Sequence, residues 1–309
     1  MKLLARIVGI FSIAIFLMWC LGNILSDRWE WSQWLAWIPT LFVIVIFTFA
    51  CVFSYFSEKK MYALIFGGIT AITLLWFCLA ENRLLNKSDQ KGQIKIVGWA
   101  MSHPKEKVAK ESAAIIVKLN GDITLLTHGW RVRGEKSIQD WLGDTGRKII
   151  HSQFTLLTKF TPLQVRTIIA SDGIYISSFV LDTTAVLGQP LVLWAVDFPS
   201  SLSQSKMDIA RRINRLLQTI ETDSPDVVIG DCNMTRNSFA LRSIFPDLQD
   251  TATLSGTGLL ASFPIEFPLY HIDHILVSNQ FHSIYYELIN PHIGRHRIQI
   301  AEISDFKEP

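Results

Sequence analysis

Three long apolar blocks near the N-terminus constrain this chain more than any other feature. They cover residues 3–25, 36–56 and 61–80, and each is close to the roughly 20 residues with which a helix crosses a bilayer. Apart from Arg6, charged residues fall only between or beside the blocks. Tryptophans cluster at one block boundary, as they do at membrane interfaces: Trp29, Trp31, Trp34 and Trp37. The blocks therefore predict three transmembrane helices.

A cleaved signal peptide is the alternative interpretation of the first block. Its apolar core is longer than the 7–15 residues typical of signal peptides, and two further blocks follow it. The composition agrees with membrane insertion, because 49% of the 309 residues are hydrophobic and only 18% are charged. We therefore predict an integral protein of an inner or plasma membrane, in contact with the lipid bilayer, with residues 1–80 as its transmembrane region.

The distribution of basic residues predicts an orientation in that membrane. They mark the N-terminus and the second loop: Lys2, Arg6, Lys59 and Lys60. The positive-inside rule then places the N-terminus in the cytoplasm and the C-terminal part outside it. The basic residues after the third block oppose this orientation: Arg83, Lys87 and Lys91.

The remainder of the chain is interpreted as a linker over residues 81–93 and one domain over residues 94–309. Strands and a few helices alternate along the domain, with several strands in succession, which indicates a mixed or antiparallel sheet architecture. The net charge of +2 and the lack of a long basic run give no evidence for a dedicated nucleic-acid surface. Cys232 is the single cysteine of this part, so neither a disulfide nor a cysteine zinc site is available to it.

Polar residues gather at the ends of three predicted strands. The apolar run before Gly230 leads into Asp231 and Asn233, Asp273 opens the strand "DHILVS", and His296 precedes the last strand. Each cluster alone is ambiguous. An Asp-x-Asn sequence is typical of a turn, and a histidine beside an aspartate is often a hydrogen-bonded core pair.

Taken in order and spacing, these segments resemble the endonuclease/exonuclease/phosphatase superfamily, which has the DNase I-like fold. "GDCN" resembles its G-D-x-N motif, "YHIDHILVS" its late I-D-H/Y strand, and "GRHRIQIAEI" its terminal S-D-H-R-P-V strand. The segments "IKIVGWAM" and "GDITLLTHGW" resemble its first two strands. Some bacterial members also carry three N-terminal membrane helices. The resemblance implies a two-sheet α/β sandwich, here preceded by three transmembrane α-helices.

The resemblance also implies hydrolysis of a phosphate ester with Mg²⁺. By the matched motifs, Asp231 orients or deprotonates the attacking water, Asn233 hydrogen-bonds a phosphate oxygen, and His296 contacts the scissile phosphate. Asp273 holds and polarises His296, because a carboxylate fixes an imidazole tautomer and stabilises its cation. His274 is expected to lie on a strand face rather than to catalyse.

The sequence departs from the family pattern where the metal is usually held. Ala100 replaces an asparagine, His128 a glutamate and Arg295 an aspartate, while Asp197 stands where the family has a histidine. Mg²⁺ requires oxygen ligands in octahedral geometry, which methyl, imidazole and guanidinium groups do not provide. The metal ligands are therefore unknown.

Two explanations of the departures remain open. In one, the site is a relic, and the domain is a binding or scaffold domain at the membrane. In the other, Arg295, with His128 beside it, binds the phosphate of a ligand and replaces the metal charge. The sequence does not identify the substrate: a lipid, a nucleotide or a nucleic acid would each fit. It does not identify the oligomeric state either.

Overall fold

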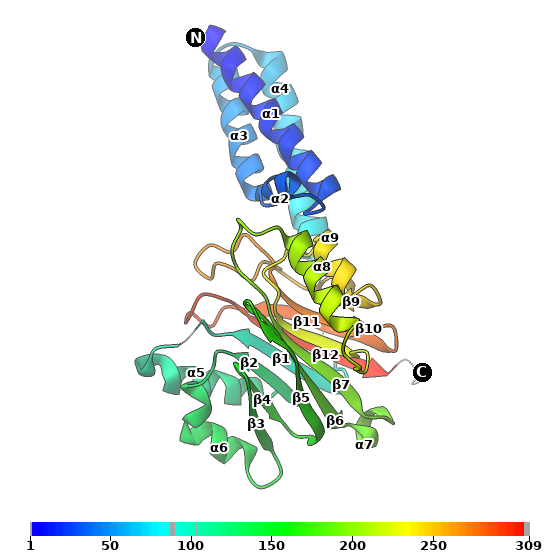
Figure 1. The fold of residues 1–309 in the computed structure, drawn as a ribbon. Coiled ribbons are helices and arrows are strands. Elements are labelled where there is room, and N and C mark those ends of the chain that lie inside the picture. Colours follow the sequence, from blue (N-terminus) through cyan, green and yellow to red (C-terminus); the bar gives the residue numbers. More distant parts are fainter. Residues whose placement is uncertain (1, 87–89, 103, 306–309) are drawn as a thin grey trace.

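The N-terminal segment forms a helical bundle that stands on one end of a two-sheet domain (Figure 1). The structure is a computed structural model that describes residues 2–86, 90–102 and 104–305. The bundle elements are α1 (Lys2–Leu25), α2 (Glu30–Ala36), α3 (Thr40–Phe56), α4 (Lys60–Trp76) and a π-helical turn (Phe77–Glu81). Within the described residues, two helices, Arg6–Leu25 and Lys60–Glu81, are long and apolar enough to cross a membrane.

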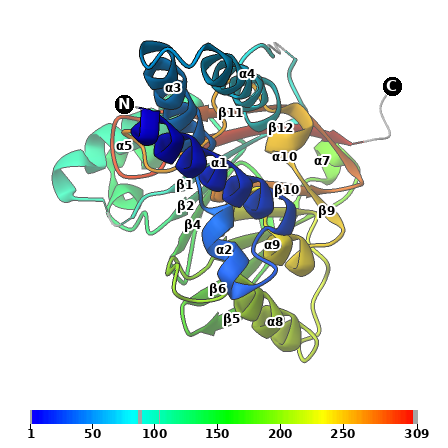
Figure 2. The same ribbon diagram turned by 90° about the horizontal axis from the view of Figure 1, so that it is seen from above.

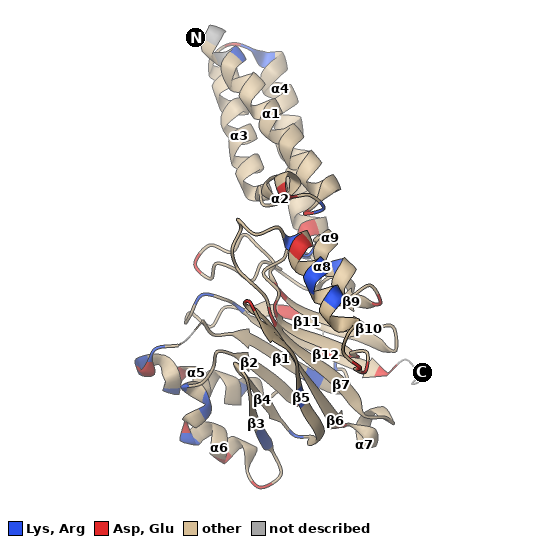
Figure 3. Ribbon diagram, in the orientation of Figure 1, with Lys and Arg blue, Asp and Glu red and all other residues tan. Residues whose placement is uncertain are grey.

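The second apolar block does not form one straight helix with its flanking residues. α2 and α3 are bent by 62° against each other, and together they would make a third span. Pro39 stands immediately before α3 in an extended conformation, and its ring and missing N–H favour a helix start there. Val43 and Phe47 of α3 are buried with Phe66 of α4 in the bundle core. Charged residues are confined to the ends of the bundle, as expected for segments in contact with lipid (Figure 3).

The soluble domain is a sandwich of two six-stranded sheets with helices on the outer faces. One sheet has the order β11-β12-β1-β2-β4-β3 and the other β5-β6-β7-β8-β10-β9. The strands of the first sheet are β1 (Ile94–Ala100), β2 (Ile123–Thr127), β3 (Arg147–His151), β4 (Phe154–Thr158), β11 (Phe281–Ile289) and β12 (Ile298–Asp305). Those of the second are β5 (Thr161–Ser171), β6 (Ile174–Asp182), β7 (Leu191–Asp197), β8 (Val227–Asp231), β9 (Leu248–Asp250) and β10 (Asp273–Ser278).

Each sheet contains one parallel pair, β1 with β2 and β7 with β8, and a helix connects the strands of each pair. The helices of the domain are α5 (Glu106–Leu119), α6 (Lys136–Leu142), α7 (Thr184–Leu187), α8 (Lys206–Leu217), α9 (Phe239–Ile244) and α10 (Thr251–Ser255), with a 3₁₀ turn at Val132–Gly134. Apolar residues from both inner faces fill the central core, while α5 and α6 cover the first sheet and α8 and α9 the second. This architecture confirms the predicted α/β sandwich.

The bundle is fastened to the domain by buried polar residues at its lower end. Asp27, between α1 and α2, accepts hydrogen bonds from the backbone N–H groups of Phe239 (2.7 Å) and Ala240 (3.1 Å) at the start of α9. Gln33 of α2 donates to the carbonyl of Leu202 (2.8 Å) and accepts from the backbone N–H of Lys206 (2.8 Å). Buried, paired polar groups of this kind hold one geometry, because separating them leaves unsatisfied donors. Figure 2 shows the bundle from above, over the domain.

The segment predicted as a linker is bound to the domain at both of its ends. Asn82 accepts a hydrogen bond from the backbone N–H of Leu260 (2.8 Å), and Arg83 pairs with Gly258 through two backbone hydrogen bonds. Near β1, the backbone N–H of Gly92 donates to the carboxylate of Glu302 (2.7 Å). Residues 87–89 of the predicted linker lie outside the described residues.

Candidate active site

Strand register brings three carboxylates together at one edge of the second sheet. Asp197 ends β7, Asp231 ends β8, and Asp273 begins β10. Asp231 is the Cα partner of Asp197 in the parallel pair and of Asp273 in the antiparallel pair. Because directly paired side chains lie on the same face of a sheet, the three acids form a row.

His296 joins this row from the loop that precedes β12. Its Nδ1 lies 2.9 Å from Oδ2 of Asp273, and its Nε2 lies 3.9 Å from Oδ2 of Asp231. The side chains are nearly enclosed, with exposed fractions of 6% for His296, 2% for Asp273 and 13% for Asp231. Since a carboxylate can only accept, Nδ1 of His296 carries a proton, and its Nε2 faces Asp231.

The turn after β8 fixes the position of the asparagine that the sequence singled out. The backbone N–H of Asn233 donates to Oδ1 of Asp231 (3.1 Å), and its side-chain amide donates to the carbonyl of Phe198 (2.9 Å). Asn233 has a φ of +49°, in the left-handed region that asparagine tolerates better than most residues. One amide hydrogen of Asn233 is thus used within the fold.

The electrostatics of the row separate the roles of its acids. Burial, together with the neighbouring Asp273 carboxylate, raises the pKa of Asp231 well above its ordinary value. Burial alone would lower the pKa of His296, but the Asp273 carboxylate outweighs it and raises that pKa to about 9. Burial also opposes the ionisation of Asp273, yet His296 holds the pKa of Asp273 below its usual value. The result is an imidazolium–carboxylate pair beside an acid that readily accepts a proton, the combination that acid–base catalysis uses.

His128 and Asp197 form a second acid–imidazole pair beside the row. Nε2 of His128 lies 3.0 Å from Oδ2 of Asp197, which also accepts from the side-chain amide of Gln153 (2.8 Å). The resemblance leads one to expect an acid at position 128 and a histidine at position 197. The structure therefore has an acid and a histidine at these two positions, but in exchanged order. The ring of His128 is hydrogen-bonded to Asp197.

Arg295 lies close to His296 but is exposed, and within the described part of the chain it makes no hydrogen bond or ion pair with Asn233 or Asp231. Its guanidinium lies 5.2 Å from the ring centroid of Phe263, and the His296 ring lies 4.9 Å from the same ring. The chain does bend between His292 and His296, with Gly294 at a φ of +80°. Phe263 was not foreseen from the sequence, although it holds both side chains.

Mg²⁺, the ion that the resemblance implies, does not fit the positions where the family usually holds it. Ala100 presents a methyl group, His128 an imidazole already bonded to Asp197, and Arg295 a positive charge. None of these provides the oxygen ligands of an octahedral Mg²⁺ site. The described residues do contain a candidate metal-binding group at the row itself, with ligand atoms of Asp231, Asp273 and His296 within 4.8 Å of one another.

Lys206 is a further cation near the site, and no sequence pattern pointed to it. The side chain is fully buried at the start of α8, and its Nζ donates to the carbonyls of Pro199 (2.7 Å) and Ser201 (3.3 Å). Burial lowers the pKa of Lys206 to about 8 against the opposing effect of Asp231 and Asp27. The Lys206 ammonium group therefore interacts electrostatically with two carboxylates, Asp231 in the row and Asp27 at the lower end of the bundle.

Several solved structures with a similar fold carry the description endonuclease/exonuclease/phosphatase. An endonuclease/exonuclease/phosphatase from Bacteroides vulgatus is similar over 69% of this chain and 98% of its own, with a TM-score of 0.52 and 16% identity. A mannosyl-6-phosphatase from Bacteroides thetaiotaomicron is similar over 68% and 99%, with a TM-score of 0.53 and 12% identity. Truncated TDP2 from Caenorhabditis elegans is similar over 68% and 97%, with a TM-score of 0.53 and 14% identity.

The domain therefore has the fold of the endonuclease/exonuclease/phosphatase proteins, as the sequence motifs indicated. No family profile matches the sequence, and no curated protein matches it. The likeness rests on the arrangement of the strands, and what the site of this chain does must be inferred from its own residues.

Proposed function

We propose that this protein is a membrane-anchored phosphoesterase that acts on a phosphate ester at the bilayer surface. The observation that carries the proposal is the position of His296, bonded to Asp273 on one side and 3.9 Å from Asp231 on the other. Asp231 accepts a proton from the attacking water as the water oxygen bonds to phosphorus. The bond from phosphorus to the ester oxygen breaks, and the departing oxygen takes a proton from solvent. The His296 cation stabilises a phosphate oxygen, and Asp273 keeps His296 charged and oriented. Asn233 offers its second amide hydrogen to the phosphate.

The bilayer surface is proposed because the loops around the site are the loops that dock on the bundle. The connection after β7 contacts Gln33, and the connection after β8 contacts Asp27. The loop before β10 reaches the bundle through Tyr270, whose hydroxyl donates to the carbonyl of Trp37 (3.2 Å). A substrate held in the membrane would meet this edge of the domain first.

The test uses the full chain, because the docking contacts bury groups that an isolated domain would expose. Protein reconstituted in vesicles is assayed with p-nitrophenyl phosphate, its bis-ester, and vesicles that contain a phosphate-monoester lipid. Each assay is run with a chelator, with Mg²⁺ and with Mn²⁺. Because the usual ligand positions are replaced, we expect hydrolysis that survives the chelator. Failure to hydrolyse any of the three probes under all conditions would refute the proposal.

A binding role on the same fold is the second candidate, favoured by the low exposure of the row and by the replacements at positions 100, 128 and 295. It predicts that inorganic phosphate or a phosphate-monoester lipid is bound but never hydrolysed. Binding without turnover in the assay above would favour this role.

The pH dependence of the rate follows from the two shifted pKa values. Hydrolysis requires ionised Asp231, which is present above its raised pKa, and protonated His296, which is lost as the pH rises through about 9. We therefore expect a bell-shaped rate profile whose alkaline limb lies near pH 9. His296→Gln should remove that alkaline limb along with most of the rate. A wild-type rate that keeps rising beyond pH 10 would contradict the assignment of His296.

The orientation inferred from the basic residues is part of the same proposal. With the N-terminus and second loop in the cytoplasm, three crossings put the domain on the extracytoplasmic side. Alkaline phosphatase fused after residue 309 should then be active, and green fluorescent protein fused there and exported through the same route should be dark. The reverse pattern would place the domain in the cytoplasm.

A further inference from the structure

A second cluster of ligand-type side chains lies on the opposite side of β10 from His296. Asp250 ends β9, His274 is the second residue of β10, and His271 lies in the loop just before that strand. Their ligand atoms all lie within 4.8 Å of one another. None of these residues takes part in the proposed reaction, and all three side chains are at most 10% exposed.

The hydrogen bonds of the two histidines orient them as metal ligands are oriented. Nε2 of His274 donates to the carbonyl of Met234 (2.8 Å), and Nδ1 of His271 donates to the carbonyl of Leu260. The remaining nitrogen of each ring therefore faces Asp250. Histidines that bind metals usually donate their other N–H to a carbonyl or carboxylate in this way.

The two distances from Asp250 lie on either side of the ligand spacing of a small tetrahedral site. Its Oδ2 is hydrogen-bonded to Nδ1 of His274 (2.8 Å) and lies 3.5 Å from Nε2 of His271. A zinc site with bonds of about 2.0–2.1 Å separates neighbouring ligand atoms by about 3.3 Å, between these two values. Nε2 of His271 is buried and, within the described part of the chain, makes no hydrogen bond, so one ligand position is oriented but unused.

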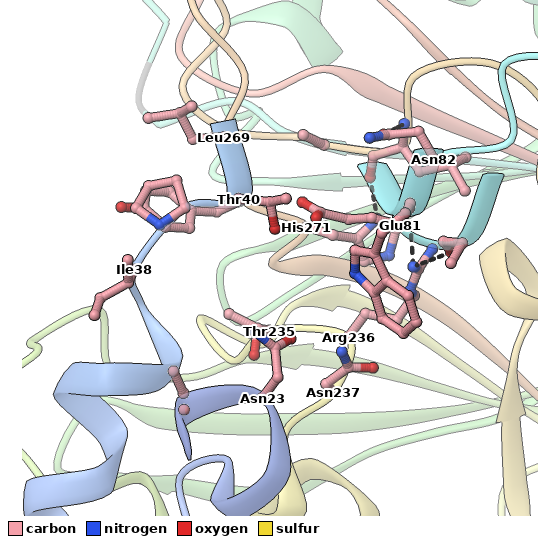
Figure 4. Close-up of a pocket in the computed structure, with 18 of the residues that line it drawn as sticks. Asn23, Ile38, Thr40, Glu81, Asn82, Thr235, Arg236, Asn237, Leu269 and His271 are labelled. Carbon is pink, nitrogen blue, oxygen red and sulfur yellow. Dashed lines mark hydrogen bonds between the residues drawn. The ribbon is translucent and has the colours of Figure 1, made fainter. Parts of the chain in front are cut away.

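A cavity borders this cluster at His271. It has a volume of about 290 Å³, lies between the lower end of the bundle and the domain, and has His271 in its wall (Figure 4). Glu81 and Arg236 line the same cavity. Arg236 is held by hydrogen bonds to the carbonyls of Ala80 (3.1 Å) and Glu81 (2.8 Å). An ion that entered this cavity would meet the cluster first at the His271 side chain, whose Nε2 is buried.

We infer that Asp250, His271 and His274 form a binding site for Zn²⁺ or a similar divalent transition metal. Two imidazoles and one carboxylate suit such ions far better than Mg²⁺, which prefers oxygen ligands. The site joins the loop before β10 to β9 and so stabilises the side of the domain that faces the bundle.

The test is metal titration of the full chain in detergent after removal of metals with a chelator. We expect one tightly bound Zn²⁺ that raises the unfolding temperature. His271→Gln should weaken it at least about 100-fold, since loss of even an indirect partner costs 10–100-fold. The matched variant His296→Gln, in the other cluster, should leave this affinity unchanged. Absence of tight Zn²⁺ binding in the wild type, or its loss in His296→Gln alone, would overturn the inference.

X-ray absorption of the wild-type zinc complex tests the same site without any variant. The inferred site gives the ion two imidazole ligands, from His271 and His274, whereas the cluster of Asp231, Asp273 and His296 can give only one. Two imidazoles in the spectrum support the inference, and one imidazole would assign the ion to the other cluster.

Discussion

Asp231→Asn is expected to lower the rate of phosphate-ester hydrolysis roughly 10³-fold, within the 10²–10⁴ range typical for loss of a general base. Asparagine has nearly the same shape, so the hydrogen bond from the backbone N–H of Asn233 (3.1 Å) can be kept. It cannot take a proton from water. Initial rates with p-nitrophenyl phosphate in reconstituted vesicles measure the effect.

The unfolding temperature should not fall in Asp231→Asn, although the rate does. Burial and Asp273 raise the pKa of Asp231, so its ionised form costs free energy in the folded state at neutral pH. The variant is therefore expected to unfold at the same or a higher temperature. Asp226→Asn, just before the other end of β8, is the matched control and should keep the rate, because the Asp226 carboxylate accepts a hydrogen bond from the backbone N–H of Val192 (2.8 Å) and takes no part in the proposed reaction. Equal rates for Asp231→Asn and the wild type would remove Asp231 from the reaction.

Gly230→Ala is expected to prevent the domain from folding or to lower its free energy of unfolding by more than about 4 kcal/mol, among the largest effects of single substitutions. Gly230 has a φ of +151°, and a Cβ there would lie 1.9 Å from the carbonyl oxygen of Val196. That oxygen belongs to the parallel partner strand, so β7 and β8 would have to separate. Urea denaturation of the full chain, followed by circular dichroism, measures the loss.

Gly134→Ala is the matched control for this substitution. A Cβ at Gly134 meets nothing within 4 Å, and its φ lies outside the left-handed region. Its stability should therefore stay within about 0.5 kcal/mol of the wild type, as for most surface substitutions. If Gly230→Ala were as stable as this control, the close contact between β7 and β8 would be wrong.

The fold was predictable because short polar motifs lie at the ends of apolar segments that form strands. Asp231, Asp273 and His296 each stood beside an apolar run, and register then brought them together. Whether these residues and Asn233 catalyse stays a prediction. Pro39 indicated the bend before Thr40, whereas the apolar character of residues 36–56 alone did not.

Contacts between distant segments could not be predicted from local patterns. Lys206 looked like any basic residue in the first turn of an amphipathic helix, yet it is fully buried. Asp27 looked like an ordinary loop charge, but its partners lie more than 200 residues away in the sequence. The cluster of Asp250 and His271 likewise combines residues from separate segments, and only the tertiary structure shows that their side chains meet.

The hydrogen bonds of Asp27 with the start of α9 and of Gln33 with Lys206 set the distance between the candidate site and the helical bundle. A domain on a flexible tether would sample a wide volume of water. In this protein, hydrogen bonds hold the domain against the bundle, so the two are expected to move together. With the bundle in a bilayer, encounters with a membrane-borne ester become a search in two dimensions at constant distance from the lipid. Solutes in bulk water gain nothing from that arrangement, and lengthening the segment after Glu81 would not extend the reach of the domain until the contacts of Asp27 were broken.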